Sequence, residues 1–406
     1  MKRGRKHKMY SDRANHIVPS ATVELNAKVA RLLSEGQDII KLNIGEPDFP
    51  TPDNIKAAAK RAIDENFTRY TPVGGIPELK IAICDKLERD NGLSYLPSEI
   101  CVGTGAKQVL LESVLVASQE KDEVLLPTPC WVSYESMVDI AGATPVLVPT
   151  IEAGSERFHL DIDRLEAAVT GRTRAIIINT PNNPTGVVYG QKELESLVAL
   201  AQKYDLWIIS DEVYEKFLYD DAKHISIASL SKEARDRTIT INGCSKTYAM
   251  TGWRVGYAAA PQTFIKKLQG LQSHITSGIN SIAQKAAVEA LNGSQLSVEI
   301  MRAAFRERKD AMYRALLHIP GVSCIDAKGA FYLMPDLSAY FGRKHAGWII
   351  KDSFDLSNYF LEEAHVAVVP GDSFRAPGCI RLSYSNSLEK IVEGMSRIEK
   401  ALSTLL

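Results

Sequence analysis

Short apolar, β-branched runs alternate with amphipathic stretches through the middle of the chain. The stretch 191–204 places its apolar residues at helical spacing, and a further helix is expected from about residue 106. The apolar runs have the length of buried strands and are bounded by small or polar residues. They predict seven strands, at residues 99–103, 123–127, 145–149, 174–180, 206–211, 238–243 and 255–260. This alternation predicts a mainly parallel sheet with helices on both faces, and ligands of such sheets gather at the carboxyl ends of the strands.

The pattern changes after about residue 262. Two long helical segments are predicted through to about residue 318, and a helix is expected near 352–364 and another at the C-terminus. Short strands are predicted at residues 322–325, 330–334, 366–369 and 380–384. This mixture predicts a smaller α+β domain, which we expect to include N-terminal residues up to about 45.

The length of 406 residues exceeds what one hydrophobic core usually holds, which agrees with two domains. We divide the chain into a basic tail, an N-terminal arm that belongs partly to the small domain, a large domain and a small C-terminal domain. Their predicted bounds are residues 1–18, 19–45, 46–295 and 296–406.

Composition excludes several classes of protein. Hydrophobic residues make up 45% of the chain and charged residues 24%, as in ordinary globular proteins, and the net charge of −1 gives no field that would attract nucleic acid or an anionic membrane. No apolar run approaches the roughly 20 residues that span a bilayer. The six cysteines show no CxxC pair and no His-rich spacing, which argues against a metal site or a disulfide framework and favours the cytoplasm. The first nine residues are basic, lack the apolar region of a secretory signal and predict a disordered tail, with a remnant of organelle targeting or a nucleic-acid contact as the alternative.

Lys246 is the strongest candidate for chemistry. It follows the predicted strand 238–243 in the sequence Gly-Cys-Ser-Lys-Thr-Tyr, where small neighbours would let an aldehyde approach its amine. Proteins attach pyridoxal phosphate to a lysine in this way. Arg254, eight residues further on, offers a fixed donor fork for a phosphate. Either residue alone is more often a solvated side chain, so the interpretation depends on the other groups that this cofactor requires.

Two further segments could meet those requirements. Residues 103–108 (Gly-Thr-Gly-Ala-Lys-Gln) follow a strand and open a helix, so their free backbone N–H groups could hold a phosphate, although such turns are often only tight turns. Asp211 ends an apolar strand, where a carboxylate is costly to bury unless it meets a cation such as a protonated pyridine nitrogen. Asp211 could instead cap the following helix.

Other polar residues complete the set. Asn183 lies in a loop held rigid by two prolines and a glycine, so its amide could point at a phenolate oxygen, and Tyr214 could donate to the same atom. Trp131 could stack on a ring or belong to the core. Arg381 lies within an apolar strand, a costly position unless it pairs with an anion such as the α-carboxylate of an amino acid. Each feature is ambiguous alone, whereas all of them together predict a pyridoxal-phosphate site.

From about residue 19 to the C-terminus the chain resembles the class I aminotransferases of fold type I, specifically the bacterial-type aspartate aminotransferase branch. The resemblance rests on Gly-Glu-Pro-Asp-Phe at 45–49, Tyr-Thr-Pro at 70–72, the loop 181–186, Ser-Asp-Glu-Val-Tyr at 210–214 and the run around Lys246. It implies an α/β fold with a mainly parallel seven-stranded sheet in the large domain and a smaller α+β domain. It also implies pyridoxal 5'-phosphate as the cofactor.

The resemblance assigns a role to individual residues. Lys246 is implied to be the Schiff-base lysine and the proton shuttle. The cofactor-binding residues that it implies are Gly105, Ala106, Lys107, Trp131, Asn183, Asp211, Tyr214, Ser245, Lys246, Arg254 and Tyr70. The substrate-binding residues that it implies are Gly45, Lys107, Trp131, Asn183, Arg381 and Thr22. Tyr70 would reach the phosphate of the neighbouring subunit, so the resemblance implies a homodimer with shared active sites.

Lys107 bears on the choice of substrate. It resembles the lysine that binds the distal carboxylate of aspartate and glutamate, with Thr22 assisting, and could otherwise only neutralise phosphate. Ala106 stands where many relatives carry glycine or serine, but it keeps the backbone N–H. Val18 stands where members that accept prephenate tend to carry a basic residue, which argues against prephenate.

We therefore expect transfer of the amino group of aspartate, or of a related amino acid, to 2-oxoglutarate by a ping-pong mechanism. Competing interpretations are an aminotransferase for aromatic amino acids, alanine or kynurenine, and a β-eliminating carbon–sulfur lyase of the same fold. A cofactor-binding transcription regulator is a third possibility. It is disfavoured because about 18 residues before the matched region are too few for a helix-turn-helix module.

Overall fold

The computed structural model describes residue 10 and residues 21–406, and for residues 21–24 it describes the backbone alone. The predicted basic tail, residues 1–18, lies outside the described residues except for Tyr10, which is exposed. Helix α2 (Ala21–Ser34) falls in the predicted N-terminal arm. Among the described residues, no helix combines the length and the apolar character that crossing a membrane requires.

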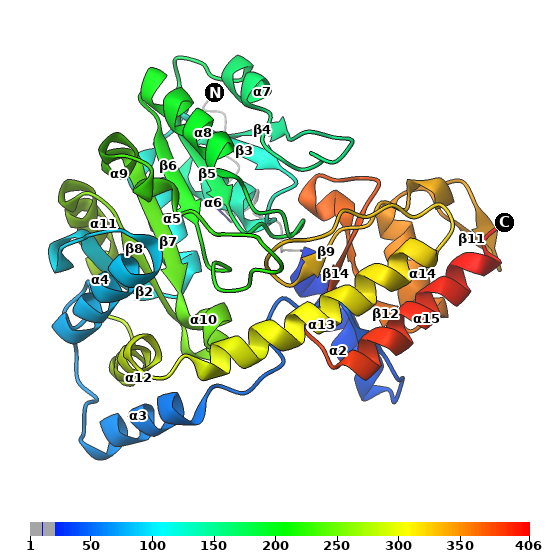
Figure 1. Cartoon of the computed structure of the whole chain (residues 1–406), viewed down its shortest axis with the longest axis horizontal. Helices are drawn as coiled ribbons and strands as arrows, with labels where there is room; N and C mark the ends of the chain where they lie inside the picture. Colours follow the sequence, from blue (N-terminus) through cyan, green and yellow to red (C-terminus); the bar gives the residue numbers. More distant parts are fainter. Residues whose placement is uncertain (1–9, 11–20) are drawn as a thin grey trace, which may run out of the picture.

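A seven-stranded sheet forms the centre of the larger part of the molecule (Figure 1). In spatial order its strands are β2 (Ile100–Thr104), β8 (Val255–Ala259), β7 (Thr238–Gly243), β6 (Trp207–Asp211), β5 (Thr173–Asn179), β3 (Glu123–Thr128) and β4 (Thr144–Pro149). Only β8 runs antiparallel to its neighbours within this sheet. The inner strands are buried on both faces, which explains their continuous apolar runs. The predicted α/β fold with a mainly parallel sheet is confirmed.

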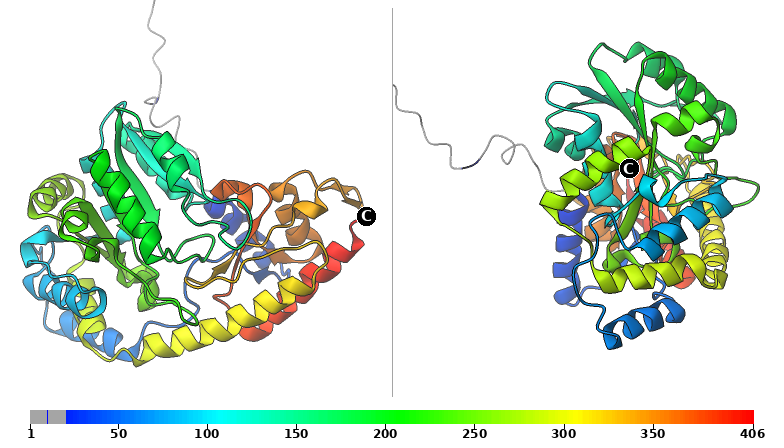
Figure 2. Two further views of the ribbon diagram at one scale, coloured as in Figure 1. Left: turned by 45° about the horizontal axis from the view of Figure 1, so that its top comes forward. Right: turned by 90° about the vertical axis from the view of Figure 1, so that its left-hand side faces the viewer.

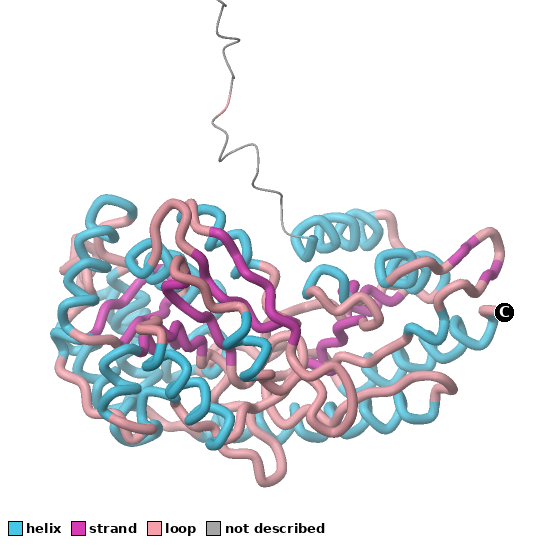
Figure 3. Tube along the Cα trace, turned by 90° about the horizontal axis from the view of Figure 1, so that it is seen from above, coloured by secondary structure: helices cyan, strands magenta, loops and turns pink. Residues whose placement is uncertain are grey.

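Helices cover both faces of this sheet (Figure 3). One face packs against α5 (Ala106–Ala117), α6 (Ser133–Ala141) and α11 (Gln262–Ile275). The other packs against α7 (Ile162–Ala167), α8 (Gln191–Lys203) and α9 (Lys232–Arg237), and at the β2 and β8 end against α3 (Asp53–Asp64), α4 (Pro77–Asn91) and α12 (Ser281–Asn292). One-turn helix α10 (Cys244–Thr247) follows β7. Short 3₁₀ turns lie at η1 (Pro97–Glu99), η2 (Ile227–Ser229), η3 (Thr251–Trp253), η4 (Ser338–Tyr340) and η5 (Gly371–Phe374).

The prediction of two long helices between residues 262 and 318 is wrong, because the structure has three: α11, α12 and α13 (Leu296–His318). The first break contains Ser277, which has a positive φ of 58°, and Gly278, which packs so closely on the backbone of Thr71 that a Cβ would lie 2.7 Å from the Thr71 carbonyl oxygen. Asn280 then caps α12 by accepting a hydrogen bond from the N–H of Ala283 at 2.8 Å. Apolar periodicity continues across such a break, so the sequence pattern did not reveal the break.

The smaller part of the molecule holds three short sheets (Figure 1). The first is antiparallel, in the order β13 (Val369–Pro370), β14 (Ile380–Ser383), β9 (Tyr332–Leu333). In the second, β1 (Ile40–Lys41) pairs in parallel with β12 (Val366–Ala367), and the third is a hairpin of β10 (Lys344–His345) and β11 (Trp348–Ile349). Helices α14 (Ser353–Glu363) and α15 (Leu388–Thr404) pack beside them.

Two of the predicted short strands need correction. Residues 322–325 form only an isolated bridge from Ser323 to Asp336, and residues 366–369 are divided between β12 and β13, which belong to different sheets. Such short pairings depend on distant partners and leave little local pattern.

Helix α13 connects the two parts (Figure 2). Its Val298 packs in the core beside α12, whereas Met301, Phe305 and Met312 pack in the core of the smaller part. α13 starts at Leu296, where the sequence predicts the small domain to begin, although the four-part division of the chain stays a prediction.

Candidate active site

A cavity of about 400 Å³ opens at the carboxyl ends of the parallel strands. β5 ends at Asn179, β6 ends at Asp211, and Lys246 lies just beyond β7. The cavity is lined by Asn26, Asn43, Gly45, Ala106, Lys107, Leu110, Trp131, Tyr134, Asn179, Asn183, Asp211, Val213, Tyr214, Ser245, Lys246, Thr251, Arg254, Tyr332 and Arg381. Most of the predicted site residues are therefore brought together in one place, as expected for an open α/β sheet.

Lys246 projects from α10 into this cavity. Its amine donates a hydrogen bond to the carbonyl oxygen of Gly45. Burial lowers the pKa of Lys246 to about 8; the carboxylate of Glu46 opposes this decrease, and the charges of Arg381 and Arg254 add to it. The unprotonated amine, the form that attacks a carbonyl carbon, is thus accessible near neutral pH.

Asp211 is buried at the end of β6 and has an exposed fraction of 4%. Tyr134 Oη donates to its Oδ2 at 2.8 Å, and the backbone N–H of Val213 donates to its Oδ1 at 3.3 Å. Burial raises the pKa of Asp211 to about 6, against the lowering effect of these two hydrogen bonds. Both donors are neutral, so a cationic group in the cavity would stabilise the ionised carboxylate.

A tight turn that could hold an anion lies at the start of α5. Gly105, with a φ of +78°, precedes the first helical residue, Ala106, and a Cβ on Gly105 would overlap the guanidinium of Arg254. A Cβ on Gly256 would overlap the backbone of Gly105 and Ala106. Backbone N–H groups at this helix start, Arg254 and the nearby hydroxyl of Ser245 could together hold a phosphate.

Arg381 is a buried cation on β14, with an exposed fraction of 4%. Its Nη1 donates to Asn183 Oδ1 at 3.0 Å and its Nη2 donates to the Asn43 carbonyl at 2.9 Å. Its guanidinium carbon lies 4.4 Å from the ring centroid of Tyr332 and 5.0 Å from that of Phe374. Within the described residues its Nε has no hydrogen-bond partner and it forms no ion pair. A carboxylate in the cavity would compensate this charge.

Lys107 provides a second cation at the cavity wall. Its Nζ donates to Ser133 Oγ at 3.2 Å and lies 4.6 Å from the ring centroid of Trp131. Burial lowers the pKa of Lys107, and the nearby charge of Arg254 adds to this effect. The hydroxyl and the ring that it contacts are uncharged, so this amine could receive a further carboxylate.

Sequence reasoning missed several lining residues. Tyr332 Oη lies 3.0 Å from Tyr214 Oη, Tyr134 holds Asp211, and Asn43 supports Arg381 through its backbone carbonyl. The one signal in the sequence was the spacing of Tyr134, three residues after Trp131 and at the start of a helix. Tyr332 and Asn43 reach the cavity only through tertiary packing and gave no local signal.

Three predicted residues do not line the described cavity: Gly105, which directly precedes the lining residue Ala106, and Tyr70 and Thr22. The Tyr70 side chain is fully exposed. Thr22 belongs to the first turn of α2, and its side chain lies outside what the structure describes. Their roles stay predictions.

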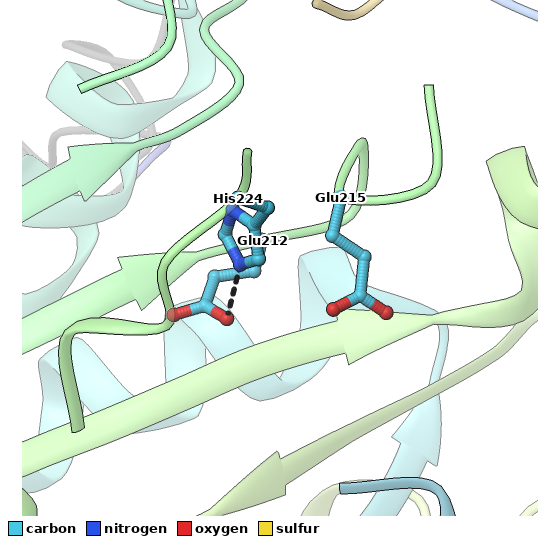
Figure 4. Close-up of side chains that lie close together, drawn as sticks. All are labelled: Glu212, Glu215 and His224. Atoms are coloured by element: carbon cyan, nitrogen blue, oxygen red, sulfur yellow. Dashed lines mark hydrogen bonds and ion pairs between the residues drawn. The ribbon is translucent and has the colours of Figure 1, made fainter. Parts of the chain in front are cut away.

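Glu212, Glu215 and His224 lie close together (Figure 4) and belong to a buried charged network in the segment after Asp211. None of the three lines the cavity. His224 Nε2 lies 2.9 Å from one carboxylate oxygen of Glu212, and the other oxygen accepts hydrogen bonds from the hydroxyls of Ser210 and Ser226. Glu215 is ion-paired with Lys86. Although burial acts to raise its pKa, the charges of Lys86 and His224 hold the pKa of Glu215 at about 2.

These acidic groups therefore already have hydrogen-bonding or ionic partners within the protein, and removing one partner would leave a buried charge uncompensated.

The open α/β sheet places a buried aspartate and an enclosed lysine at its strand ends, with the cations Lys107 of α5 and Arg381 of β14 at the same cavity, as in an α/β enzyme. A family model for aminotransferase class I and II matches residues 37–398, and the chain belongs to this family.

Close relatives agree with this assignment. The chain is 46% identical over 393 residues to an aspartate aminotransferase of Bacillus sp. strain YM-2, covering 97% of this chain and 98% of that protein. It is 45% identical over 397 residues to a probable aspartate/prephenate aminotransferase of Aquifex aeolicus, covering 97% of this chain and 99% of that protein.

Solved structures are similar as well. The aspartate aminotransferase of Rhizobium meliloti superposes with a TM-score of 0.94 at 39% identity, covering 98% of this chain and 99% of that chain. The aspartate aminotransferase of Thermus thermophilus with maleate superposes with a TM-score of 0.90 at 40% identity, covering 97% of this chain and 99% of that chain. The fold is thus that of the fold-type I aminotransferases, as the sequence predicts.

Proposed function

We propose that this protein is an aspartate aminotransferase that uses pyridoxal 5'-phosphate and passes the amino group to 2-oxoglutarate. The observation that carries the proposal is the convergence of Lys246, Asp211 and Arg381 in one cavity with Lys107 at its wall. Relatives named aspartate aminotransferase are 44–46% identical over nearly the whole chain, which supports aspartate as the amino donor.

The cradle at α5 fits the phosphate of this cofactor. Both Gly105 and Gly256 lie where a Cβ would collide with neighbouring atoms, so the two segments approach as closely as a phosphate cradle requires. Arg254 supplies the matching charge, and the backbone N–H of Ala106 and the hydroxyl of Ser245 supply further donors.

The middle of the cavity fits the ring. Asp211, whose hydrogen-bond donors are neutral, would pair with the protonated ring nitrogen, and that cation would return the pKa of the carboxyl below about 6. The Asn183 amide and the Tyr214 hydroxyl would donate to the phenolate oxygen. Trp131 would stack on the ring face.

Lys246 would carry the cofactor covalently and move the proton. When bound, the cofactor supplies an electron sink that makes the α-proton of an amino acid removable. The free Lys246 amine would act as the general base, and its pKa of about 8 would keep the free base populated near neutral pH. Asp211 would hold the proton on the ring nitrogen. A second 2-oxo acid would run the same steps in reverse.

Two cations would fix the substrate. Arg381 would bind the α-carboxylate by both prongs, beside the backbone of Gly45. Lys107 would bind the distal carboxylate, with Thr22 assisting. The separate placement of these cations favours a dicarboxylic amino acid over a neutral one.

We also propose a homodimer in the cytoplasm. Tyr70 is an aromatic residue with a fully exposed side chain, as expected of a residue that reaches the phosphate site of a neighbouring subunit. All six cysteines are free, which agrees with a reducing compartment. Sedimentation of the purified protein tests the dimer, and restoration of activity on mixing Tyr70→Phe with Lys246→Ala subunits tests the shared site.

The proposed function is tested by titrating the cofactor-loaded protein with L-aspartate while following the cofactor absorbance. Rapid conversion to the pyridoxamine form with release of oxaloacetate is expected. A response to L-tyrosine, L-alanine or L-kynurenine but not to L-aspartate would contradict the specificity and retain the transamination chemistry.

The same preparation tests for lyase activity and for prephenate as the amino acceptor. Release of pyruvate and ammonia from a β-substituted alanine would reveal the lyase. Transfer of the amino group to added prephenate would contradict the expectation drawn from Val18, which lies outside the described residues.

A further inference from the structure

Tyr332 lies between two parts of the cavity: the part that contains the Arg381 cation and the part that would hold the cofactor. It lies on β9, whose neighbouring strand β14 carries Arg381, and it has an exposed fraction of 1%. Its ring lies beneath the Arg381 guanidinium, at 4.4 Å from the guanidinium carbon to the ring centroid. Its hydroxyl lies 3.0 Å from that of Tyr214, which follows β6 of the large sheet. One side chain thus touches both the carboxylate-binding cation and a phenol of the cofactor site.

Which hydroxyl donates the hydrogen bond between Tyr332 and Tyr214 depends on what Tyr214 itself binds. Each phenol has a single proton. If Tyr214 donates its proton to an acceptor in the cavity, its oxygen can only accept from Tyr332. Burial raises the pKa of both phenols, so both stay protonated and act as donors. A phenol that accepts one hydrogen bond donates more strongly through its own O–H.

The position of the Tyr332 hydroxyl is fixed by close packing. A Cβ on Gly45 would lie 3.0 Å from Tyr332 Oη, so even alanine at position 45 would crowd this hydroxyl. Phe331 and Tyr332 pack against the Tyr214 ring with centroids at 5.3 and 5.8 Å, both nearly perpendicular. The aromatic neighbours therefore hold both rings in place and leave the hydroxyl bond as the polar link between them.

We propose that Tyr332 is a positioning residue with two separable roles: its hydroxyl strengthens proton donation by Tyr214 to the cofactor phenolate, and its ring supports Arg381 for the substrate carboxylate. The inference rests on the proposed function, because it assumes the cofactor and substrate placements given there. It adds a residue that acts through Tyr214 and Arg381.

Two substitutions separate the roles. Tyr332→Phe removes the hydroxyl and keeps the ring, whereas Tyr332→Leu removes both. In the cofactor-loaded protein, a weaker Tyr214 donor leaves the phenolate more basic, so the lysine-bound cofactor holds its shared proton to higher pH. For Tyr332→Phe we expect the pH midpoint of the cofactor absorbance to rise by about 0.1 to 0.7, because the loss of one accepted hydrogen bond weakens the remaining charge-assisted bond from Tyr214 by roughly 10–30%. The charged groups that also face the cavity, Lys246, Asp211, Arg254, Lys107 and Arg381, are unchanged.

Maleate binding measures the second role, because this dicarboxylate has no amino group to react. Tyr332→Phe should keep the dissociation constant within about twofold. Tyr332→Leu should raise it about 3- to 30-fold, the range expected for a lost cation–π contact.

A double variant removes the ambiguity of altered folding. In a Tyr214→Phe background the Tyr332 hydroxyl has no partner to strengthen, so adding Tyr332→Phe should leave the absorbance midpoint where Tyr214→Phe alone puts it. The control is Tyr219→Phe, since the Tyr219 hydroxyl is also buried but donates to the Ala330 carbonyl outside the cavity lining. This control should keep both the midpoint and maleate affinity of the unsubstituted protein.

The inference is overturned if Tyr332→Phe leaves the midpoint unchanged, if the control moves it equally, or if Tyr332→Leu keeps maleate affinity. The inference would also be overturned if Tyr332→Phe shifted the absorbance midpoint equally in the unsubstituted protein and in the Tyr214→Phe background. Failure of the proposed function looks different: the unsubstituted protein would then show no pH-dependent absorbance of a lysine-bound cofactor.

Discussion

Replacing Tyr134 by phenylalanine removes the hydroxyl that holds Asp211 and leaves the ring in place. Tyr134 is buried, with an exposed fraction of 1%, and its Oη donates to Asp211 Oδ2 at 2.8 Å. Burial raises the pKa of Asp211 to about 6, and this hydrogen bond is the strongest of the effects that limit the rise. Without it, the carboxylate would lose its best stabilising contact in the cofactor-free protein.

The magnitude follows from the strength of such a bond. A hydrogen bond to a charged group contributes about 1.5–3 kcal/mol, and about 1.4 kcal/mol corresponds to one unit of pKa. We therefore expect the pKa of Asp211 to rise by about 1 to 2, to about 7–8, in Tyr134→Phe.

The direction of the effect on stability follows from proton binding. Between the unfolded pKa of 3.8 and the folded pKa of about 6, the folded protein binds more protons than the unfolded chain, so stability falls as pH rises. In the unsubstituted protein the loss from Asp211 ends just above about pH 6. In Tyr134→Phe this loss of stability should continue to about pH 8 and be larger by about 1.5–3 kcal/mol.

Urea unfolding of the cofactor-free protein between pH 5 and pH 8 measures this difference. We expect the free energies of unfolding of the two proteins to diverge above about pH 6, with the variant lower. Tyr95→Phe is the control, because Tyr95 is a buried tyrosine that does not line the cavity, and it should differ from the unsubstituted protein by a constant amount. Parallel curves for Tyr134→Phe would refute the reasoning, because they would show that its hydroxyl does not govern the charge on Asp211.

Four further changes test other parts of the structure. Lys246→Ala should lower turnover with aspartate and 2-oxoglutarate by at least about 10²-fold, since it removes the amine proposed to transfer the proton; near-normal kcat would exclude that role. Lys107→Met should lower kcat/KM for aspartate about 10- to 100-fold and leave alanine little changed, and equal losses for both would contradict a distal-carboxylate site. Gly256→Ala should weaken cofactor binding by pushing on the phosphate cradle, whereas Gly252→Ala, with open space at its Cβ, should not; dialysis equilibria compare them. Lys86→Met should destabilise by about 3–5 kcal/mol, because it leaves the Glu215 carboxylate buried without its cation, and adding Glu215→Gln should recover much of that loss in urea unfolding.

The fold was predictable where sequence pattern and tertiary structure depend on the same property. The seven strands of the large sheet include inner strands buried on both faces, so each of these is a continuous apolar run that ends at a polar residue such as Asp211. The break between α11 and α12 was not predictable in this way. It depends on the close approach of Gly278 to Thr71, more than 200 positions earlier in the chain.

The candidate site divides similarly. Lys246, Asp211 and Arg254 lie in short segments whose composition is unusual on its own, so they could be proposed from the sequence. Tyr332 and Asn43 could not, because an ordinary tyrosine and asparagine become part of the cavity only when the three-stranded sheet and the β1 segment are placed beside the large sheet. The roles of all the site residues stay predictions until the variants are measured.

The segment after β1 contributes to the cavity through its main chain. The carbonyl of Asn43 accepts a hydrogen bond from Arg381, and the carbonyl of Gly45 accepts one from Lys246. No side-chain substitution removes a carbonyl oxygen, so alanine scanning would pass over both contacts. Replacing an amide by an ester, which weakens the carbonyl as an acceptor without changing any side chain, is the chemical change that would expose what this stretch contributes. A ligation junction in the exposed residues 33–38, just before β1, would make the experiment practicable.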